Sequence, residues 1–366
     1  MTAPSVGAAW PGLGALVTSP YNPQFDLNEA VGQRVATYAF ALTDGITGEI
    51  LGDLAPIRPA QLTHDTSRVI KRELSFSLGR ADTAAIDPVR DRVSPFMLIG
   101  NNAYPLGRYM FADDSRQKFT SGDLGTERLY DEMFRIDQQI EQGLTGAGRP
   151  TVAVIAAAMA GIDVHIEVEA SPYSSVESWA IGAHRGSQVL EALSVTGDFW
   201  SPWLDNTGVL RFQRTFDPAL RVPDIDLDRW PRVERDSIMH SSDLLTAPNV
   251  FIITSNAAND PNQPVVGRAA VPNSAPNSVV NRGFAIPDVR TLQLADGNQA
   301  TAVAQGLAQR QTIAETVTLN TPPDPRHDSY NVIRWDGANW LEIAWSLTLL
   351  EGEPMAHVMR KSYDPS

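Results

Sequence analysis

Alternating hydrophobic and polar positions predict strands in the first third of the chain. Successive side chains of a strand point to opposite faces, so a half-buried strand repeats every second residue. That alternation runs through Ala36 to Leu42, Leu74 to Leu78 and Leu106 to Asp113, and a short apolar run covers Phe96 to Ile99. Asp44-Gly45 begins a turn between the first strand and the next. The pattern predicts a β-barrel or β-sandwich.

The stretch from Glu177 to Gln213 combines a strand, a helix and a hairpin. Ser187 is expected to cap a short helix, and Gly197 follows where a left-handed residue would end it. The apolar positions of this helix fall on one face: Val189, Leu190 and Leu193. Asp205-Asn206-Thr207-Gly208 then predicts a tight turn, followed by an alternating strand.

Two segments before this stretch also suggest helix. Pro150 suits the first helical position and Gly161 the end of a helix, with a strand expected from Ile162 to Val168. The apolar residues Val152, Ile155, Ala156 and Met159 are expected to share its face. Leu129 to Gln142 has apolar residues at helical spacing and also a weaker strand pattern, so its secondary structure stays open.

The last third predicts a second β unit with an insertion. Pro218 to Pro231 is predicted to be a boundary, because prolines stand at both ends and at Pro223 and charged residues lie between them. Asn249 to Thr254 reads as a buried strand, and Ser255 to Pro287 as a long loop rich in Asn, Pro, Ser and Gly. Asn298 is expected to cap a helix that runs to about Glu315.

Two long strands and a third one are expected to close the chain. Tyr330 to Trp335 and Trp340 to Leu350 flank a turn at Asp336-Gly337, and Met355 to Arg360 follows. In the second of these strands one face is expected to carry Leu341, Ile343, Trp345 and Leu347.

These elements suggest a mainly β, multi-domain α+β protein. Residues 1–33 are rich in Pro, Gly and Ala and are interpreted as an arm. Its aromatic and apolar residues need burial, either on a neighbouring molecule or on the same chain: Trp10, Leu13, Tyr21 and Phe25. The expected units are residues 34–148, a first β-barrel; 149–220, a small α/β domain; 221–254 with 316–366, a second β-barrel; and 255–315, an inserted loop-and-helix domain.

Composition excludes several classes of function. The 366 residues contain no cysteine, so there is no disulfide framework, thiolate zinc site or cysteine nucleophile. The formal charge of −14 argues against general nucleic-acid binding, because phosphate recognition depends on clustered cations. No run reaches the roughly 18 to 20 apolar residues that span a bilayer, so membrane insertion is not expected. The protein is expected to be made soluble in a cytoplasm.

Three acidic or histidine clusters are candidates for metal or catalytic sites. Asp224, Asp226 and Asp228 resemble the start of a calcium loop, but Arg229 and Arg235 stand where glycine and glutamate are needed. A solvated strand face explains these aspartates better.

Histidines offer two further candidates. His165, Glu167 and Glu169 share one side of a strand, where a polar exposed face is favoured over a metal site. His327-Asp328 lies in a Pro-rich turn and supplies half of a nucleophile triad, but no serine sits in a Gly-x-Ser-x-Gly elbow.

Five tryptophans suggest either a sugar-binding platform or buried packing, and their apolar neighbours favour packing: Trp179, Trp200, Trp203, Trp340 and Trp345. No catalytic, cofactor-binding or metal-binding residue is therefore predicted, and no enzyme activity.

The central stretch resembles hub proteins at the distal end of long phage tails. The shared order is Trp179-x-x-Gly182, a short helix, an aromatic strand and Asp205-x-x-Gly208-x-Leu210-x-Phe212, within a likeness from Val35 to Arg360. These minor tail proteins are similar to the baseplate hub of contractile tails and to the amino-terminal part of tail-associated lysins. One departure is Asn331, where the family is expected to carry aspartate.

The resemblance implies a structural virion protein of a siphophage tail tip. Such a hub has two tube domains per chain, so a trimer builds a ring of six similar units that matches a hexameric tail tube and lines the DNA path. Expected partners are the distal tail protein, the tape-measure protein and a central fibre or other minor tail proteins. Alternatives are a tail-associated cell-wall or polysaccharide hydrolase and a carbohydrate- or receptor-binding protein.

Overall fold

We describe residues 35–363 of a computed structural model, with gaps at 57, 79–85, 101, 113–124, 230–232, 244, 258–259 and 312–314. The chain is mainly β with a few short helices, as its hydrophobic pattern predicts. The arm predicted for residues 1–33 lies outside the described residues.

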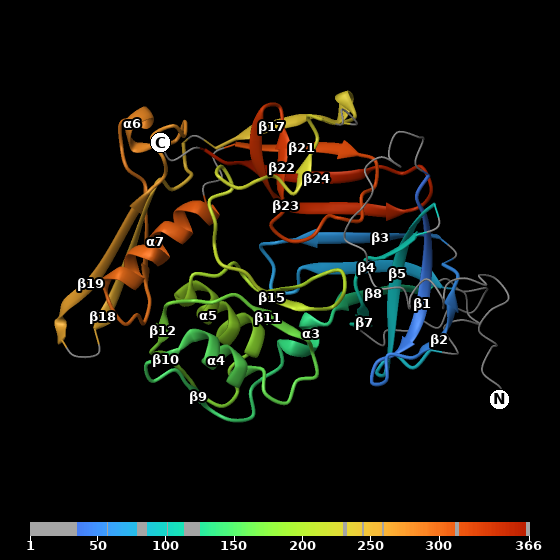
Figure 1. Cartoon of the computed structure of the whole chain (residues 1–366), viewed down its shortest axis with the longest axis horizontal. Coiled ribbons are helices and arrows are strands. Elements are labelled where there is room, and N and C mark those ends of the chain that lie inside the picture. Colours follow the sequence, from blue (N-terminus) through green and yellow to red (C-terminus); the bar gives the residue numbers. More distant parts are fainter. Residues whose placement is uncertain are drawn as a thin grey trace.

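One large sheet joins strands from both ends of the chain (Figure 1). Along its main path the strands are β17 (Met239–Ser242), β21 (Glu315–Thr321), β24 (Met355–Lys361), β23 (Ala338–Leu349), β3 (Arg58–Asp65), β4 (Arg72–Leu78), β8 (Gly125–Asp131), β7 (Tyr109–Phe111), β5 (Asp91–Ile99), β1 (Thr37–Asp44) and β2 (Ile50–Leu54). Three more strands branch from this path: β6 (Asn102–Pro105) from β5, β22 (Val332–Trp335) from β23, and β16 (Ile225–Asp226) from β22.

The pairing of β3 with β23 fuses the amino-terminal and carboxy-terminal strands. Their antiparallel register runs from Ala344 opposite Asp65 to Leu349 opposite Ala60. Two separate barrels or sandwiches were expected, but in the described residues strands of both expected units share one sheet, and no sheet closes on itself. The alternation in β4 is borne out, because Leu74 and Leu78 are fully buried.

A bulge in β23 changes which residues share a face. The register shifts between Glu342 and Ala344, so one residue in this stretch has no partner in β24. An extra residue reverses the alternation beyond it. Trp345 and Leu347 therefore pack in the core of the amino-terminal strands, whereas Leu341 packs against Trp200 on the other side. The expectation that Leu341 and Ile343 share a face with Trp345 is wrong for this reason.

A small α/β unit occupies the middle of the chain (green in Figure 1). It contains α3 (Met133–Ile136), β9 (Leu144–Thr145), β10 (Arg149–Pro150), α4 (Thr151–Ala158), β11 (Ile166–Val168), β12 (Ser174–Ser175), β13 (Ser178–Trp179), the π-helical turn η2 (Arg185–Leu190), α5 (Glu191–Gly197), β14 (Trp203–Leu204) and β15 (Leu210–Phe212). The hairpin of β14 and β15 and the turn glycine Gly208, at φ +86°, are as predicted.

The helix boundaries in this unit differ from the prediction by a few residues. Helical structure begins at Arg185 rather than after Ser187, and the left-handed residue is Asp198 rather than Gly197. Asp137 caps the start instead, because its carboxylate accepts from the backbone N–H of Ser187 at 2.6 Å. In α4, Pro150 precedes the helix, and Ala156 is exposed while Val154 is buried.

The segment left open between helix and strand contains both. β8 runs to Asp131 and the helix α3 covers only Met133–Ile136. The apolar residues at helical spacing are nevertheless all buried: Leu129, Met133, Ile136 and Ile140. Helical spacing alone therefore overestimates the length of the helix.

The inserted unit packs a helix on a small sheet at one flank of the molecule (Figure 1). β18 (Val250–Ala257) lies between β19 (Asp260–Ala270) and β20 (Pro287–Thr291), and α7 (Gly297–Gln311) covers it; α6 (Val279–Arg282) lies in the connection. The predicted strand at Asn249–Thr254 is present but belongs to this sheet. The stretch predicted as a long loop contains β19 and α6. A 3-10 turn, η3 (Arg235–Ser237), precedes β17.

Candidate functional site

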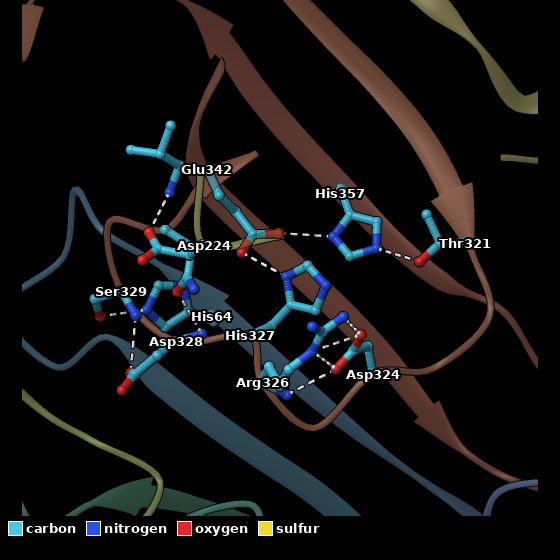
Figure 2. Close-up of polar contacts among 12 residues, drawn as sticks. His64, Asp224, Thr321, Asp324, Arg326, His327, Asp328, Ser329, Glu342 and His357 are labelled. Atoms are coloured by element: carbon cyan, nitrogen blue, oxygen red, sulfur yellow. Dashed lines mark hydrogen bonds and ion pairs between the residues drawn. The ribbon is translucent and has the colours of Figure 1, made fainter. Parts of the chain in front are cut away.

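A buried polar cluster lies where the amino-terminal strands, the carboxy-terminal strands and the small α/β unit meet. Its centre is the segment 322–329, between β21 and β22, which we call the junction loop. Figure 2 shows side chains of the junction loop and of neighbouring strands directed toward one another. Burying polar groups is costly unless they are paired, so these side chains are expected to find most of their partners within the cluster.

Two histidines converge on one buried glutamate (Figure 2). Nδ1 of His327, from the junction loop, lies 2.8 Å from Oε2 of Glu342, and Nδ1 of His357, from β24, lies 2.6 Å from Oε1. Relative exposure is 3% for His327 and 0% for Glu342 and His357. Nε2 of His357 contacts the hydroxyl of Thr321 at 2.8 Å. We call His327, Glu342 and His357 the triad.

The three groups share charge unequally. Burial disfavours a charged His327, but the Glu342 carboxylate overcomes this and raises the pKa of His327 above its ordinary value. Burial and the neighbouring His327 lower the pKa of His357. Although burial favours a neutral acid, His327 and His357 hold the pKa of Glu342 below its ordinary range. The shared carboxylate and burial thus act differently on the two histidines, raising the pKa of His327 and lowering that of His357.

Arg72 connects the junction loop to the rest of the molecule. It is 1% exposed, and its guanidinium contacts the carboxylate of Asp328 at 2.5 Å and Oδ1 of Asn206 at 2.7 Å. Asn206, in the hairpin turn of the α/β unit, donates in turn to the carbonyls of Pro325 and His327. One arginine therefore links β4, the α/β hairpin and the junction loop.

Two carboxyl groups near Arg72 have raised pKa values. Burial raises the pKa of Asp328 to about 6, against the opposing charge of Arg72. Burial likewise raises the pKa of Asp131 to about 6, although Arg72 and two backbone N–H groups favour its charged form.

The predicted half-triad of His327 and Asp328 does not assemble a nucleophile. The two side chains point into different contacts, His327 to Glu342 and Asp328 to Arg72. A different Ser–His contact exists, between Ser329 Oγ and His64 Nε2 at 2.8 Å. Nδ1 of His64 has no hydrogen-bond partner in the described part of the chain, and both residues are buried. Among the described residues no carboxylate orients His64, and both members of the contact are buried, so the contact lacks two features of a nucleophile triad.

The other candidate clusters are neutralised by neighbouring groups. Asp224 accepts from the N–H of Val332 at 2.8 Å, and Asp228 accepts from the backbone of the Asp336-Gly337 turn. These aspartates fasten backbone rather than forming only a solvated face.

The strand near His165 also behaves as a polar surface. The side chains of His165 and Glu167 are 70% and 52% exposed, and Arg211 pairs with Glu167. Four tryptophans are buried, which supports packing rather than a sugar platform: Trp200, Trp203, Trp340 and Trp345.

Sequence reasoning missed Arg72, Glu342 and His357. Glu342 interrupts an apolar strand between Leu341 and Ile343, and that interruption was the available signal. A charged residue inside an apolar strand needs a buried partner. Its partners come from 15 residues to either side in sequence, so spacing could not identify them.

Comparisons with solved structures identify proteins of similar fold. No family model matches the chain, and no curated protein sequence matches it significantly. Solved phage tail proteins do match in structure. A 43 kDa tail protein of prophage MuSo2 from Shewanella oneidensis aligns with a TM-score of 0.56 and 12% identity, over 89% of this chain and 98% of that one. The chain has the fold of a phage tail protein.

Two further tail proteins support the same conclusion. The tail protein from Neisseria meningitidis MC58 aligns with a TM-score of 0.54 and 12% identity, over 90% of this chain and 97% of that chain. Prophage tail protein gp18 from Listeria monocytogenes EGD-e gives a TM-score of 0.50 and 10% identity, over 90% and 95%. The resemblance inferred from the sequence is confirmed at the level of fold.

Proposed function

We propose that this protein is a structural hub at the distal tip of a long non-contractile phage tail. The observation that carries the proposal is the end-to-end likeness to phage tail proteins, which takes up 89% of this chain and 98% of the Shewanella protein. The likeness leaves little of the chain for a separate catalytic domain. The buried triad and the Arg72 contacts fit a structural role, since both fasten parts of the molecule together.

The hub is proposed to be a homotrimer whose ring surrounds the path of the DNA. Each chain would contribute two tube-building units, one from residues 34–148 and one from residues 221–254 with 316–366 apart from β18, which lies in the inserted sheet. The antiparallel pairing of β3 with β23 suits two such units in one subunit. The charge of −14 suits a wall that does not retain DNA, because an acidic surface repels phosphate. The proposed neighbours are the distal tail protein, the tape-measure protein and a central fibre.

Light scattering with negative-stain imaging of the purified chain tests this proposal. A hollow particle of three chains supports the hub. The rival functions predict other results: hydrolysis of peptidoglycan or polysaccharide by the purified chain would favour an enzyme, and sugar binding by a monomer would favour a receptor-binding protein. A chain that stays monomeric alone and when mixed with distal tail protein would contradict the hub.

A further inference from the structure

Three side chains with metal-ligating atoms converge at the triad. Nδ1 of His327 lies 2.8 Å from Oε2 of Glu342, and Nδ1 of His357 lies 2.6 Å from Oε1. Each histidine therefore directs one ring nitrogen toward the carboxylate, while Nε2 of His357 contacts the hydroxyl of Thr321 at 2.8 Å.

The convergence lies in the interior of the fold. Glu342 and His357 are 0% exposed, His327 is 3% exposed, and the two imidazole rings lie 4.5 Å apart, centroid to centroid. Two imidazoles and one carboxylate directed at the same buried point are a donor set that transition-metal sites use.

We propose that His327, Glu342 and His357 bind a divalent first-row transition-metal ion, with Zn²⁺ the expected occupant. Their ligand atoms all lie within 4.8 Å of one another. The two Nδ1 atoms and the two oxygens of Glu342 make four donors, and imidazole with carboxylate suits zinc, whereas Ca²⁺ and Mg²⁺ prefer oxygen alone. Metal–ligand bonds of about 2.0 to 2.2 Å in a tetrahedral site require nitrogen–oxygen separations of roughly 3.3 to 3.6 Å, so on metal binding the present 2.6 and 2.8 Å contacts have to open by about 0.5 to 1 Å.

The surroundings of the triad suit a metal site in two ways. Thr321 orients His357 through its second ring nitrogen, as the outer contacts of metal-bound histidines do. Asp324 lies nearby but is engaged by Arg326, with Nη2 to Oδ2 at 2.5 Å, so it neutralises the arginine and leaves the ligand positions to the triad. Bound metal would clamp the junction loop onto β23 and β24.

The test uses the full chain without a histidine tag, stripped of metal by a chelator and then titrated with Zn²⁺ alone in a calorimeter. One Zn²⁺ per chain is expected, with a rise in Tm, and Mg²⁺ is expected to give neither. Co²⁺ in place of Zn²⁺ should give the visible absorption of a four-coordinate site in the unaltered chain. His357→Asn should abolish binding, and His165→Asn, which alters a side chain that is 70% exposed, should leave it unchanged.

A milder variant separates the metal from a purely protonic triad. Thr321→Val keeps every ligand and removes only the outer contact, so Zn²⁺ affinity should fall about 10- to 100-fold. If the unaltered chain binds neither Zn²⁺ nor Co²⁺, or if His357→Asn and Glu342→Gln bind Zn²⁺ as well as the unaltered chain does, the triad is held together by protons and the proposal is wrong. None of these outcomes depends on whether the chain forms a hub.

Discussion

Replacing Arg72 with methionine tests how the three parts of the molecule are held together. Arg72 is 1% exposed and bonds both Asp328 and Asn206, so Arg72→Met leaves the Asp328 carboxylate without this cation, with the backbone N–H of Ser329 as a remaining donor, and removes the Arg72 donor from the Asn206 amide oxygen. Removing one partner of a buried ion pair typically costs about 3 to 5 kcal/mol, because the other charge stays behind unpaired. The side chain of Asp328 keeps 27% exposure, which places the expected loss at pH 8 near the lower end, about 3 kcal/mol.

The loss of stability caused by Arg72→Met should be smaller at low pH, because the Asp328 carboxyl group is then protonated. Asp328 has its folded pKa raised to about 6, so at pH 5 it is largely neutral and Arg72→Met no longer strands a charge. Only lost hydrogen bonds and packing remain, about 1 to 2 kcal/mol. Because Arg72 opposes the raised pKa of Asp328, its removal raises that pKa further, and the variant keeps losing stability as pH rises from 6 toward 8, where the carboxylate of the parent protein has already formed.

The assay is denaturant unfolding of both proteins at pH 5 and pH 8. Arg68→Met is a matched control, because the Arg68 side chain is 59% exposed and its ion pairs with Asp65 and Glu73 are at the surface. It should cost less than about 1 kcal/mol at either pH. If Arg72→Met costs no more than Arg68→Met, or costs the same at pH 5 and pH 8, the reasoning about the junction fails.

Three further predictions follow from single features. A Cβ on Gly267 would lie 2.1 Å from the backbone of Ala300 in α7, so Gly267→Ala should destabilise the inserted unit by about 1 to 3 kcal/mol in thermal unfolding. Gly52 has open space around it, so Gly52→Ala should be nearly neutral. Equal effects of the two substitutions would refute this prediction. Because Asp131 has its folded pKa raised to about 6, its contribution to stability is present below about pH 4 and is lost as pH rises through 6. The stability difference between the parent protein and Asp131→Asn should therefore change by up to about 3 kcal/mol between pH 4 and 7, and a difference that does not vary with pH would contradict the assigned burial. Deleting residues 1–30 should leave the fold intact, as measured by circular dichroism, and should weaken assembly by several kcal/mol. Each apolar side chain that the arm buries on a neighbour contributes about 1.5 to 3 kcal/mol. If the shortened chain assembles as strongly as the full chain, the arm is not part of the interface.

Local pattern predicted most elements but not how the sheets are joined. The hairpin around Asp205 to Gly208 and the alternation in β4 depend on residues adjacent in sequence, so both could be inferred directly. The pairing of β3 with β23 joins residues almost 300 positions apart, which no local period encodes. Alternation assumes an unbroken register, so the bulge beside Glu342 made the predicted face of Leu341 wrong relative to that of Trp345.

The polar junction was out of reach for the same reason. The sequence places His327 beside Asp328, whereas in the fold the partner of His327 is Glu342. Arg72 looks like any surface arginine in an alternating strand, and only the packing of the hairpin turn and the junction loop over it makes it buried.

Single-particle electron cryomicroscopy of the assembled full chain tests the hub most directly. We predict three copies around a hollow axis, with the large sheets forming the wall and acidic side chains facing the lumen. A monomer in the presence of the distal tail protein, or a ring whose bore is lined by arginines with the acidic residues outside, would contradict the account.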